Sequence, residues 1–136
     1  MNFSFSLIHD NLVVETLWFG NLTGEIIVAG VVRHNNWIIQ NSDTLPLVLL
    51  FDFTQANLDK VSEMDLQIIK DHFKGIENIF PGVNWIGIMP SNVKYSTVKM
   101  WLDHAENISN NSYIVKNRVN AKDIISNVLS PAPHTI

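Results

Sequence analysis

The sequence contains no cysteine, and charged residues make up only 16% of its 136 positions. Without thiols the chain can form no disulfide, and it offers no thiolate ligand for zinc or an iron–sulfur cluster and no cysteine nucleophile. Lys and Arg are scattered and the net charge is −4, whereas nucleic-acid binding requires clustered positive charge to replace phosphate counterions. We therefore expect no nucleic-acid partner.

Long apolar runs are missing as well. No run approaches the length of about 20 residues that a helix needs to cross a bilayer. The N-terminal residues lack both the positive charge and the continuous apolar segment of a secretory signal peptide. We therefore expect a cytoplasmic protein without a transmembrane segment.

The motifs that carry catalysis or metal binding are also absent from the sequence. The six glycines are dispersed, so no phosphate-binding glycine loop exists. Ser91 follows an apolar segment but lacks the second glycine of a hydrolase nucleophile elbow. No two of the five histidines have the i, i+4 spacing of a helical metal pair, and we expect each histidine at the surface or its boundary. We predict no catalytic residue, no metal site and no cofactor.

The most informative segment that is present is the apolar run from Leu47 to Phe53. A strand that is apolar on both faces must be covered on both, which is typical of a central parallel strand. Asp52 lies at the carboxyl end of this run, and the polar residues from Thr54 to Lys60 are expected to form a loop. Open α/β sheets usually bind their ligands at this end of their strands.

The residues before this run predict an antiparallel hairpin and a helix. Phe3–Leu7 alternates between apolar and serine side chains, as a half-buried strand near a sheet edge does. Turn residues at positions 9–11 lead into a second strand over residues 12–19. Thr23 is the predicted N-cap of the helix, and Ile27, Gly30, Val31, His34 and Ile38 lie on one of its faces.

The residues after the run predict three more helices that alternate with two strands. Ser62 and Asp65 have the spacing of a capping box at the start of a helix. Strands are expected over residues 83–89 and 112–116, and helices over residues 93–107 and from Asn120 to the prolines at 131 and 133. The order β-β-α-β-α-β-α-β-α predicts one α/β domain over residues 1–130, with a mostly parallel five-stranded sheet and an N-terminal antiparallel hairpin. Residues 131–136 are expected to form a flexible tail.

This order resembles that of the STAS domain, the fold of anti-sigma factor antagonists of the SpoIIAA type. The residues that carry the resemblance are the strand ending in Asp52, the Ser62-capped helix and the strand from Trp85 to Met89. The chain looks closest to the divergent SpoIIAA-like branch related to STAS and SEC14-type lipid-binding domains. The resemblance implies a non-enzymatic regulatory or interaction module with a protein partner. Its contact face would be the loops at the carboxyl ends of the strands, with the candidate binding residues Asp52, Thr54, Ser62, Pro90, Ser91 and Asn92.

The resemblance also implies a role for Ser62, because a serine at this position is phosphorylated in the antagonist family. A phosphate at a helix N-terminus meets free backbone N–H groups and the positive end of the helix dipole. In this sequence the family's Asp-Ser-Ser-Gly-like signature is missing, and the acidic residues Glu63 and Asp65 would repel a phosphate. A plain N-cap role for Ser62 is therefore favoured over a phosphorylation switch.

Asp52 also has two interpretations. Its carboxylate could orient a ligand or a metal at the edge of the sheet. It could equally stabilise the following loop by accepting hydrogen bonds from the N–H groups of Thr54 or Gln55, as aspartate does in turns. The second interpretation is favoured, because no partner motif accompanies Asp52.

The helix after Thr23 is apolar over an unusually broad arc, which leaves further functions open. Trp37 and Ile39 lie off its main stripe, and if exposed they would form an apolar patch of the kind that marks a partner or lipid contact. Burial of the arc, for example in a homodimer, is the alternative. Besides the regulatory module, we therefore consider a carrier of a small apolar ligand or lipid, and an enzyme with an unrecognised site near Asp52 and Ser91.

Overall fold

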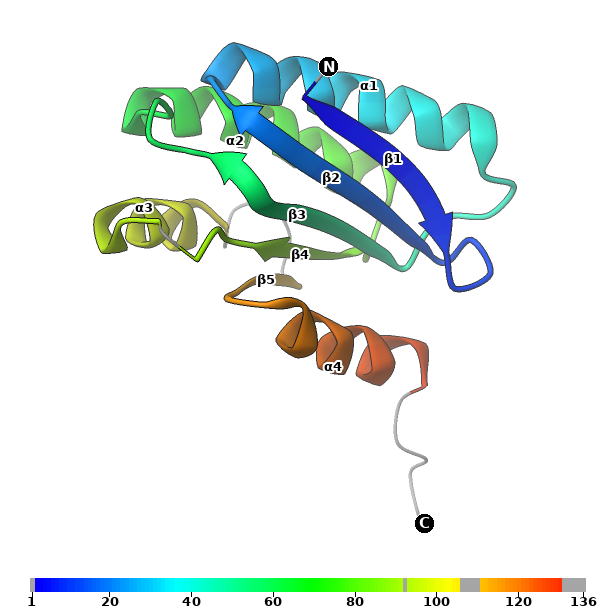
Figure 1. Cartoon of the computed structure of the whole chain (residues 1–136). Helices are drawn as coiled ribbons and strands as arrows, with labels where there is room; N and C mark the ends of the chain where they lie inside the picture. The colour runs from blue at the N-terminus through cyan, green and yellow to red at the C-terminus, as the bar shows by residue number, and fades with distance from the viewer. Residues whose placement is uncertain (1, 92, 106–110, 131–136) are drawn as a thin grey trace.

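The computed structural model describes residues 2–91, 93–105 and 111–130. Within these ranges strands and helices follow one another in the predicted order (Figure 1). They are β1 (Phe3–Ile8), β2 (Val13–Asn21), α1 (Gly24–Asn41), β3 (Val48–Asn57), α2 (Glu63–Ile79), β4 (Asn84–Ile88), α3 (Tyr95–Ala105), β5 (Ser112–Val115) and α4 (Arg118–Leu129). The predicted tail, residues 131–136, lies outside the described residues, as does the predicted end of the third helix.

The strands form one sheet in the order β1-β2-β3-β4-β5. β1 pairs with β2 antiparallel, and every other neighbouring pair is parallel. The turn between β1 and β2 places His9, Asp10 and Asn11 at positive φ, a conformation that these residue types adopt more readily than most. The predicted α/β fold, with its antiparallel hairpin and its central apolar strand β3, is confirmed.

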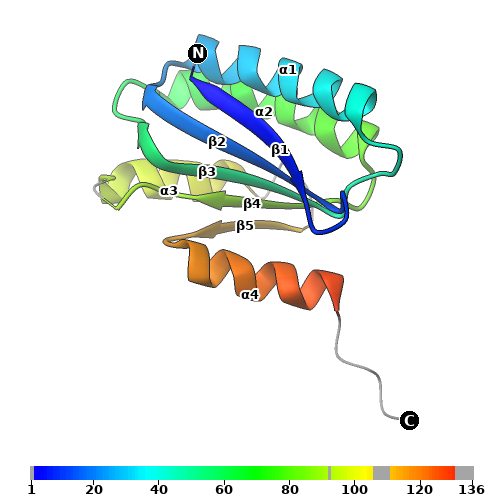
Figure 2. The same ribbon diagram turned by 45° about the vertical axis from the view of Figure 1, so that its right-hand side comes forward.

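Helices cover the two faces of the sheet unequally (Figures 1 and 2). α1, α2 and α3 lie on one face, over a large apolar core that includes Trp18, Phe51, Trp85 and Trp101. On the other face α4 packs over β4 and β5, where Ile125 closes a smaller core. β3 contributes to both cores by alternation, which explains why its sequence is apolar on both faces.

A glycine allows α1 to approach the sheet closely. A Cβ atom at Gly30 would collide with the ring of Trp18 and crowd Phe3. The other predicted contact residues of the helix, Ile27, Val31 and Ile38, are all buried. The cost of a glycine inside a helix, roughly 1 kcal/mol relative to alanine, is therefore offset by tight packing of an aromatic side chain.

Several predicted boundaries were wrong, among them the end of β3 and the starts of α3 and α4. β3 continues to Asn57 instead of ending at Phe53, because β2 also continues and pairs with residues 55–57 beyond an irregularity at residues 17–19. α3 begins at Tyr95, two residues later than expected. α4 begins at Arg118 instead of Asn120, because Asn117 is the N-cap and its side-chain oxygen accepts a hydrogen bond from the N–H of Asn120 at 2.9 Å.

Candidate functional site

Asp52 does not lie at the tip of its strand. Because β3 extends to Asn57, Asp52 lies within the sheet, opposite Ile88 at the end of β4, and only 4% of it is exposed. Its Oδ1 accepts hydrogen bonds from the backbone N–H of Thr54 at 2.9 Å and from the Thr54 hydroxyl at 2.7 Å. The bond to the Thr54 N–H that the sequence suggested is therefore present, although it stabilises a strand and not a loop.

The second oxygen of Asp52 pairs with an arginine that no sequence motif connects with it. Arg118, the first residue of α4, donates to Asp52 Oδ2 at 2.5 Å and to Glu15 Oε2 at 2.7 Å. The hydrogen bond to Glu15 is the main cause of a raised Arg118 pKa; partial burial opposes this, and the bond to Asp52 adds to it. The cluster of Glu15, Asp52 and Arg118 thus links β2, β3 and α4.

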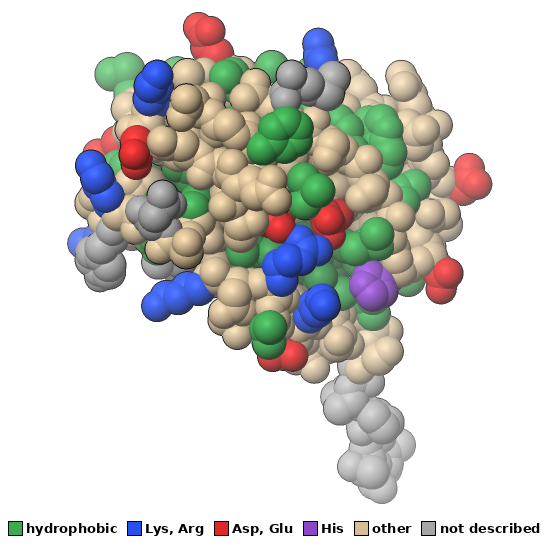
Figure 3. Space-filling model, viewed as in Figure 1, with side chains coloured by type: hydrophobic (Ala, Val, Ile, Leu, Met, Phe, Trp, Pro, Cys, Tyr) green, Lys and Arg blue, Asp and Glu red, His purple; other side chains and the backbone are tan. Residues whose placement is uncertain are grey.

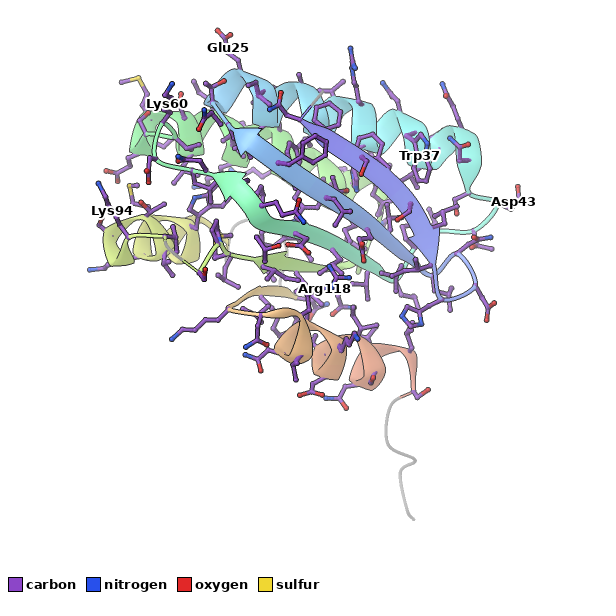
Figure 4. The ribbon with its side chains drawn as sticks, viewed as in Figure 1. Glu25, Trp37, Asp43, Lys60, Lys94 and Arg118 are labelled. Carbon is purple, nitrogen blue, oxygen red and sulfur yellow. The ribbon has the colours of Figure 1, made fainter. Side chains whose placement is uncertain are left out.

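This cluster lies on the face of the sheet that α4 leaves partly uncovered. Figure 4 shows Arg118 between the sheet and α4, and Figure 3 shows basic and acidic side chains side by side there, among apolar ones. The adjoining pocket measures about 50 Å³, and its lining includes His9 and Lys122 together with Glu15 and Arg118 of the cluster. Drug-sized ligands occupy pockets of roughly 300–1,000 Å³, so this one is too small for them. Paired charges in so small a space act mainly to hold α4 on the sheet.

Two loops at the carboxyl end of the sheet form a second region. Residues 58–62 follow β3, residues 89–94 follow β4, and a pocket of about 20 Å³ lies between them. Asn57, Leu58, Asp59, Pro90 and Val93 line this pocket. Since it holds little more than one water molecule, the surface here is nearly closed. We call the described residues of these two loops the loop face.

The loop face contains some of the predicted binding residues but not all of them. Ser62 and Ser91 are exposed there, whereas Pro90 is buried beneath it. Asp52 belongs to the cluster around Arg118, Thr54 donates a hydrogen bond to Asp52, and Asn92 lies outside the described residues. The structure therefore divides the predicted site into two parts.

Ser62 forms the predicted capping box. Its Oγ accepts a hydrogen bond from the N–H of Asp65 at 3.1 Å, and its own N–H donates to Asp65 Oδ2 at 3.0 Å. The carboxylate of Asp65 therefore occupies the position at the start of α2 where an anion would otherwise bind. Glu63 adds a second negative charge in the same turn.

Replacing this cap should weaken the fold measurably. We expect Ser62→Ala to lower the free energy of unfolding by about 1 kcal/mol, because one helix N–H loses its acceptor. Chemical denaturation gives the value. Ser91→Ala is the matched control on the same surface and should change stability by less than about 0.5 kcal/mol. Equal losses in the two variants would contradict the role of the cap.

His34 was expected at the surface or its boundary, and this expectation is wrong. The side chain is fully buried in the large core, edge-on to the rings of Phe5 and Phe51. Its Nδ1 forms a hydrogen bond with Asn35 Oδ1 at 2.9 Å, and its Nε2 is buried with no partner among the described residues. Burial lowers the pKa of His34 from 6.5 to about 4, so the ring is neutral at pH 7.

The broad apolar arc of α1 is only partly buried. Trp37 is half-buried against Phe5, with ring centroids 5.6 Å apart, while Ile39 is 62% exposed. Between α1 and α2 an open groove of about 390 Å³ is lined by Gly24, Glu25, Val28, Ala29, Asp65 and Ile68. This outer surface therefore presents apolar side chains to solvent.

The described residues show neither a metal site nor a membrane-spanning helix. No three of their His, Asp and Glu side chains gather closely enough to hold a metal ion. No helix among them is both long enough and apolar enough to pass through a bilayer. Both carboxylate oxygens of Asp52 are engaged in hydrogen bonds, one with Thr54 and the other with Arg118.

The arrangement of strands and helices has a known counterpart. The structure is similar to that of the anti-sigma factor antagonist SpoIIAA in its unphosphorylated form, with a TM-score of 0.57. The alignment covers 90% of this chain and 96% of that one at 11% sequence identity. The chain has the SpoIIAA fold. No protein-family model and no curated protein sequence matches it. The resemblance to SpoIIAA is confirmed at the level of the fold, where backbone topology is retained although few residues are identical.

Proposed function

We propose that this chain is a non-enzymatic regulatory module of the STAS type that binds a partner protein through its loop face. The fold is one support, since SpoIIAA is by its name an antagonist of another protein. The observation that carries the proposal is the nearly closed surface between the two loops, with a pocket of only about 20 Å³. Such a surface suits contact with a protein better than enclosure of a small substrate.

The polar groups of the loop face are suited to this role. Asp59, Lys60, Ser62, Ser91 and Lys94 are all exposed. Figure 4 shows Lys60 and Lys94 projecting at the same end of the molecule, one from each loop. Rim charges of this kind guide a partner to its site and fix its orientation more than they add affinity.

In this proposal Ser62 acts as a cap and contact residue and not as a phosphorylation switch. Its Oγ already accepts a hydrogen bond from the N–H of Asp65. The negative carboxylates of Asp65 and Glu63 would also lie close to any phosphate on Ser62 and repel it. Peptide mass spectrometry of digested protein purified from its natural source should show no phosphate on the peptide containing Ser62. A stoichiometric phosphate there would overturn this assignment while leaving the contact face intact.

Charge reversal on the loop face tests the proposal. We expect K60E/K94E to reduce the recovery of specific partners in quantitative affinity capture from the natural host by at least about tenfold, a loss of roughly 1.4 kcal/mol. K74E/K122E makes the same change in net charge at exposed positions on α2 and α4, and should retain the wild-type partners. Equal recovery in all three samples would contradict a contact at the loop face.

The groove between α1 and α2 favours a second candidate, a carrier of a small apolar ligand or lipid. Its volume of about 390 Å³ falls in the size range of ligand pockets, and Val28 and Ile68 give it apolar walls. Mass spectrometry of an organic extract of the purified protein would then show a bound lipid that is lost from Ile68→Asp. Extracts without any stoichiometric ligand would exclude this candidate.

A further inference from the structure

Among the residues that the structure describes, β2 is the one strand neighbour of β1, which lies at the edge of the sheet (Figure 1). Natural proteins usually protect such edges with lysine, proline or a bulge. β1 has none of these: its sequence is Phe-Ser-Phe-Ser-Leu-Ile, and its pairing with β2 is regular along its length. An unprotected edge strand of this kind is a template for another strand.

The register with β2 determines which backbone groups face the open edge. The N–H of Phe19 donates to the carbonyl of Asn2 at 2.9 Å, so Asn2 and Phe19 form a hydrogen-bonded pair of the antiparallel ladder. In such a ladder alternate residues direct both backbone groups to the partner strand and the others direct both away. Ser4, Ser6 and Ile8 therefore face β2, and the N–H and C=O groups of Phe3, Phe5 and Leu7 face the open edge.

We propose that β1 pairs with β1 of a second copy of this chain, in an antiparallel register centred on Phe5. In this register Phe5 lies opposite Phe5 of the second copy, and Phe3 lies opposite its Leu7. Each of the three edge-facing residues then gains one donated and one accepted hydrogen bond. The two-fold axis is perpendicular to the sheet, so the two sheets continue into one and both copies present α1 on the same side.

The charge and shape of the edge favour a second copy over another partner. The molecule carries a net charge of −4, so two copies repel each other unless they meet at a neutral surface. The β1 edge is such a surface, because residues 1–9 contain no Asp, Glu, Lys or Arg. On the α1 side, Phe5 and Leu7 are half-buried, and Phe5 already contacts Trp37. Pairing across the axis places the Phe5 and Trp37 rings of one copy next to those of the other, and removes the exposed parts of these rings from water.

The proposed register also brings Ser4 opposite Ser6 of the second copy. Both serines are exposed on the opposite face of the sheet from α1, so charges introduced there lie outside the large core, although position 6 is paired with Glu15 of β2. In S4E/S6E two like-charged pairs would face each other across the axis. In S4K/S6E the same positions would hold opposite charges. S126E/S130E, at exposed positions at the end of α4, is the control for the added negative charge.

Analytical ultracentrifugation across a wide concentration range measures the effect. We expect a wild-type dimer, a dissociation constant raised roughly tenfold or more in S4E/S6E, and dimers close to wild type in S4K/S6E and S126E/S130E. A wild-type monomer up to millimolar concentration would overturn the proposal. So would a dimer that S4E/S6E leaves unchanged, or one that S4K/S6E fails to restore.

Amide hydrogen exchange tests the same pairing without any substitution. The N–H groups of Phe5 and Leu7 should exchange more slowly as protein concentration rises, because only the dimer protects them. The N–H groups of Ser4 and Ser6 face β2 and should change little. Exchange at Phe5 and Leu7 that is independent of concentration in a dimeric sample would place the interface elsewhere, including at the α1–α2 groove.

Discussion

Acidification should destabilise this protein through one buried side chain, His34. Its pKa is about 6.5 when exposed and about 4 in the fold, so the unfolded chain takes up the proton first. The contribution of neutral His34 to stability is fully present above pH 6.5 and is lost as the pH falls from 6.5 towards 4. By pH 4 the loss from this residue amounts to about 3 kcal/mol, a large part of the stability of a typical domain.

The difference between two titrations isolates this effect. His34→Phe keeps a ring between Phe5 and Phe51 and removes the group that titrates. Because carboxylates also titrate near pH 4, the quantity to compare is the free energy of unfolding of wild type minus that of the variant, measured by urea denaturation from pH 7.5 to 4. This difference should fall as the pH decreases. Parallel curves would show that His34 does not titrate in this window.

Removing the Arg118 side chain should be the most damaging change on the surface of the protein. Arg118→Met leaves the carboxylate of Asp52, whose side chain is 5% exposed, without its cation. Loss of one partner from a buried pair costs about 3–5 kcal/mol. Since the Arg118 side chain is 44% exposed and Thr54 still donates to Asp52, we expect the free energy of unfolding to fall by about 2–3 kcal/mol, somewhat less than that cost.

Two further variants show whether the loss comes from the unpaired carboxylate. Asp52→Asn in the Arg118→Met background removes the charge while keeping an acceptor for the Thr54 N–H, and should recover part of the stability. Lys122→Met removes another exposed cation from α4 and should change the free energy of unfolding by less than about 0.5 kcal/mol. A loss in Lys122→Met as large as that in Arg118→Met would point to lost helix packing instead.

Most of the fold follows from local patterns in the sequence. Apolar periodicity located the strands and helices, and the run around Phe51 is central because both of its faces are apolar. The capping box at Ser62 could be predicted because its two residues are three positions apart. The position of Gly30 on one helical face with Ile27 and Val31 also follows from periodicity, whereas its contact with Trp18 is visible only in the structure.

The candidate site was harder to predict because it depends on contacts between distant segments. Arg118 and Asp52 are 66 residues apart, and nothing local to either one marks the other as its partner. The end of β3 was misplaced because its last residues are polar, and only their pairing with β2 keeps them in the strand. His34 has the helical position of a core residue, but its imidazole suggested the surface, and packing between two phenylalanines decided the outcome.

Site-specific photo-crosslinking tests most directly whether the loop face is where a partner binds. A photoreactive amino acid would replace Lys60 or Lys94 on the loop face and, as controls, Lys74 on α2 or Lys122 on α4, with crosslinking in the natural host followed by mass spectrometry. We expect the same partner protein to be crosslinked from positions 60 and 94 and from neither control. Crosslinks of one partner only from positions 74 or 122 would contradict the proposed contact face.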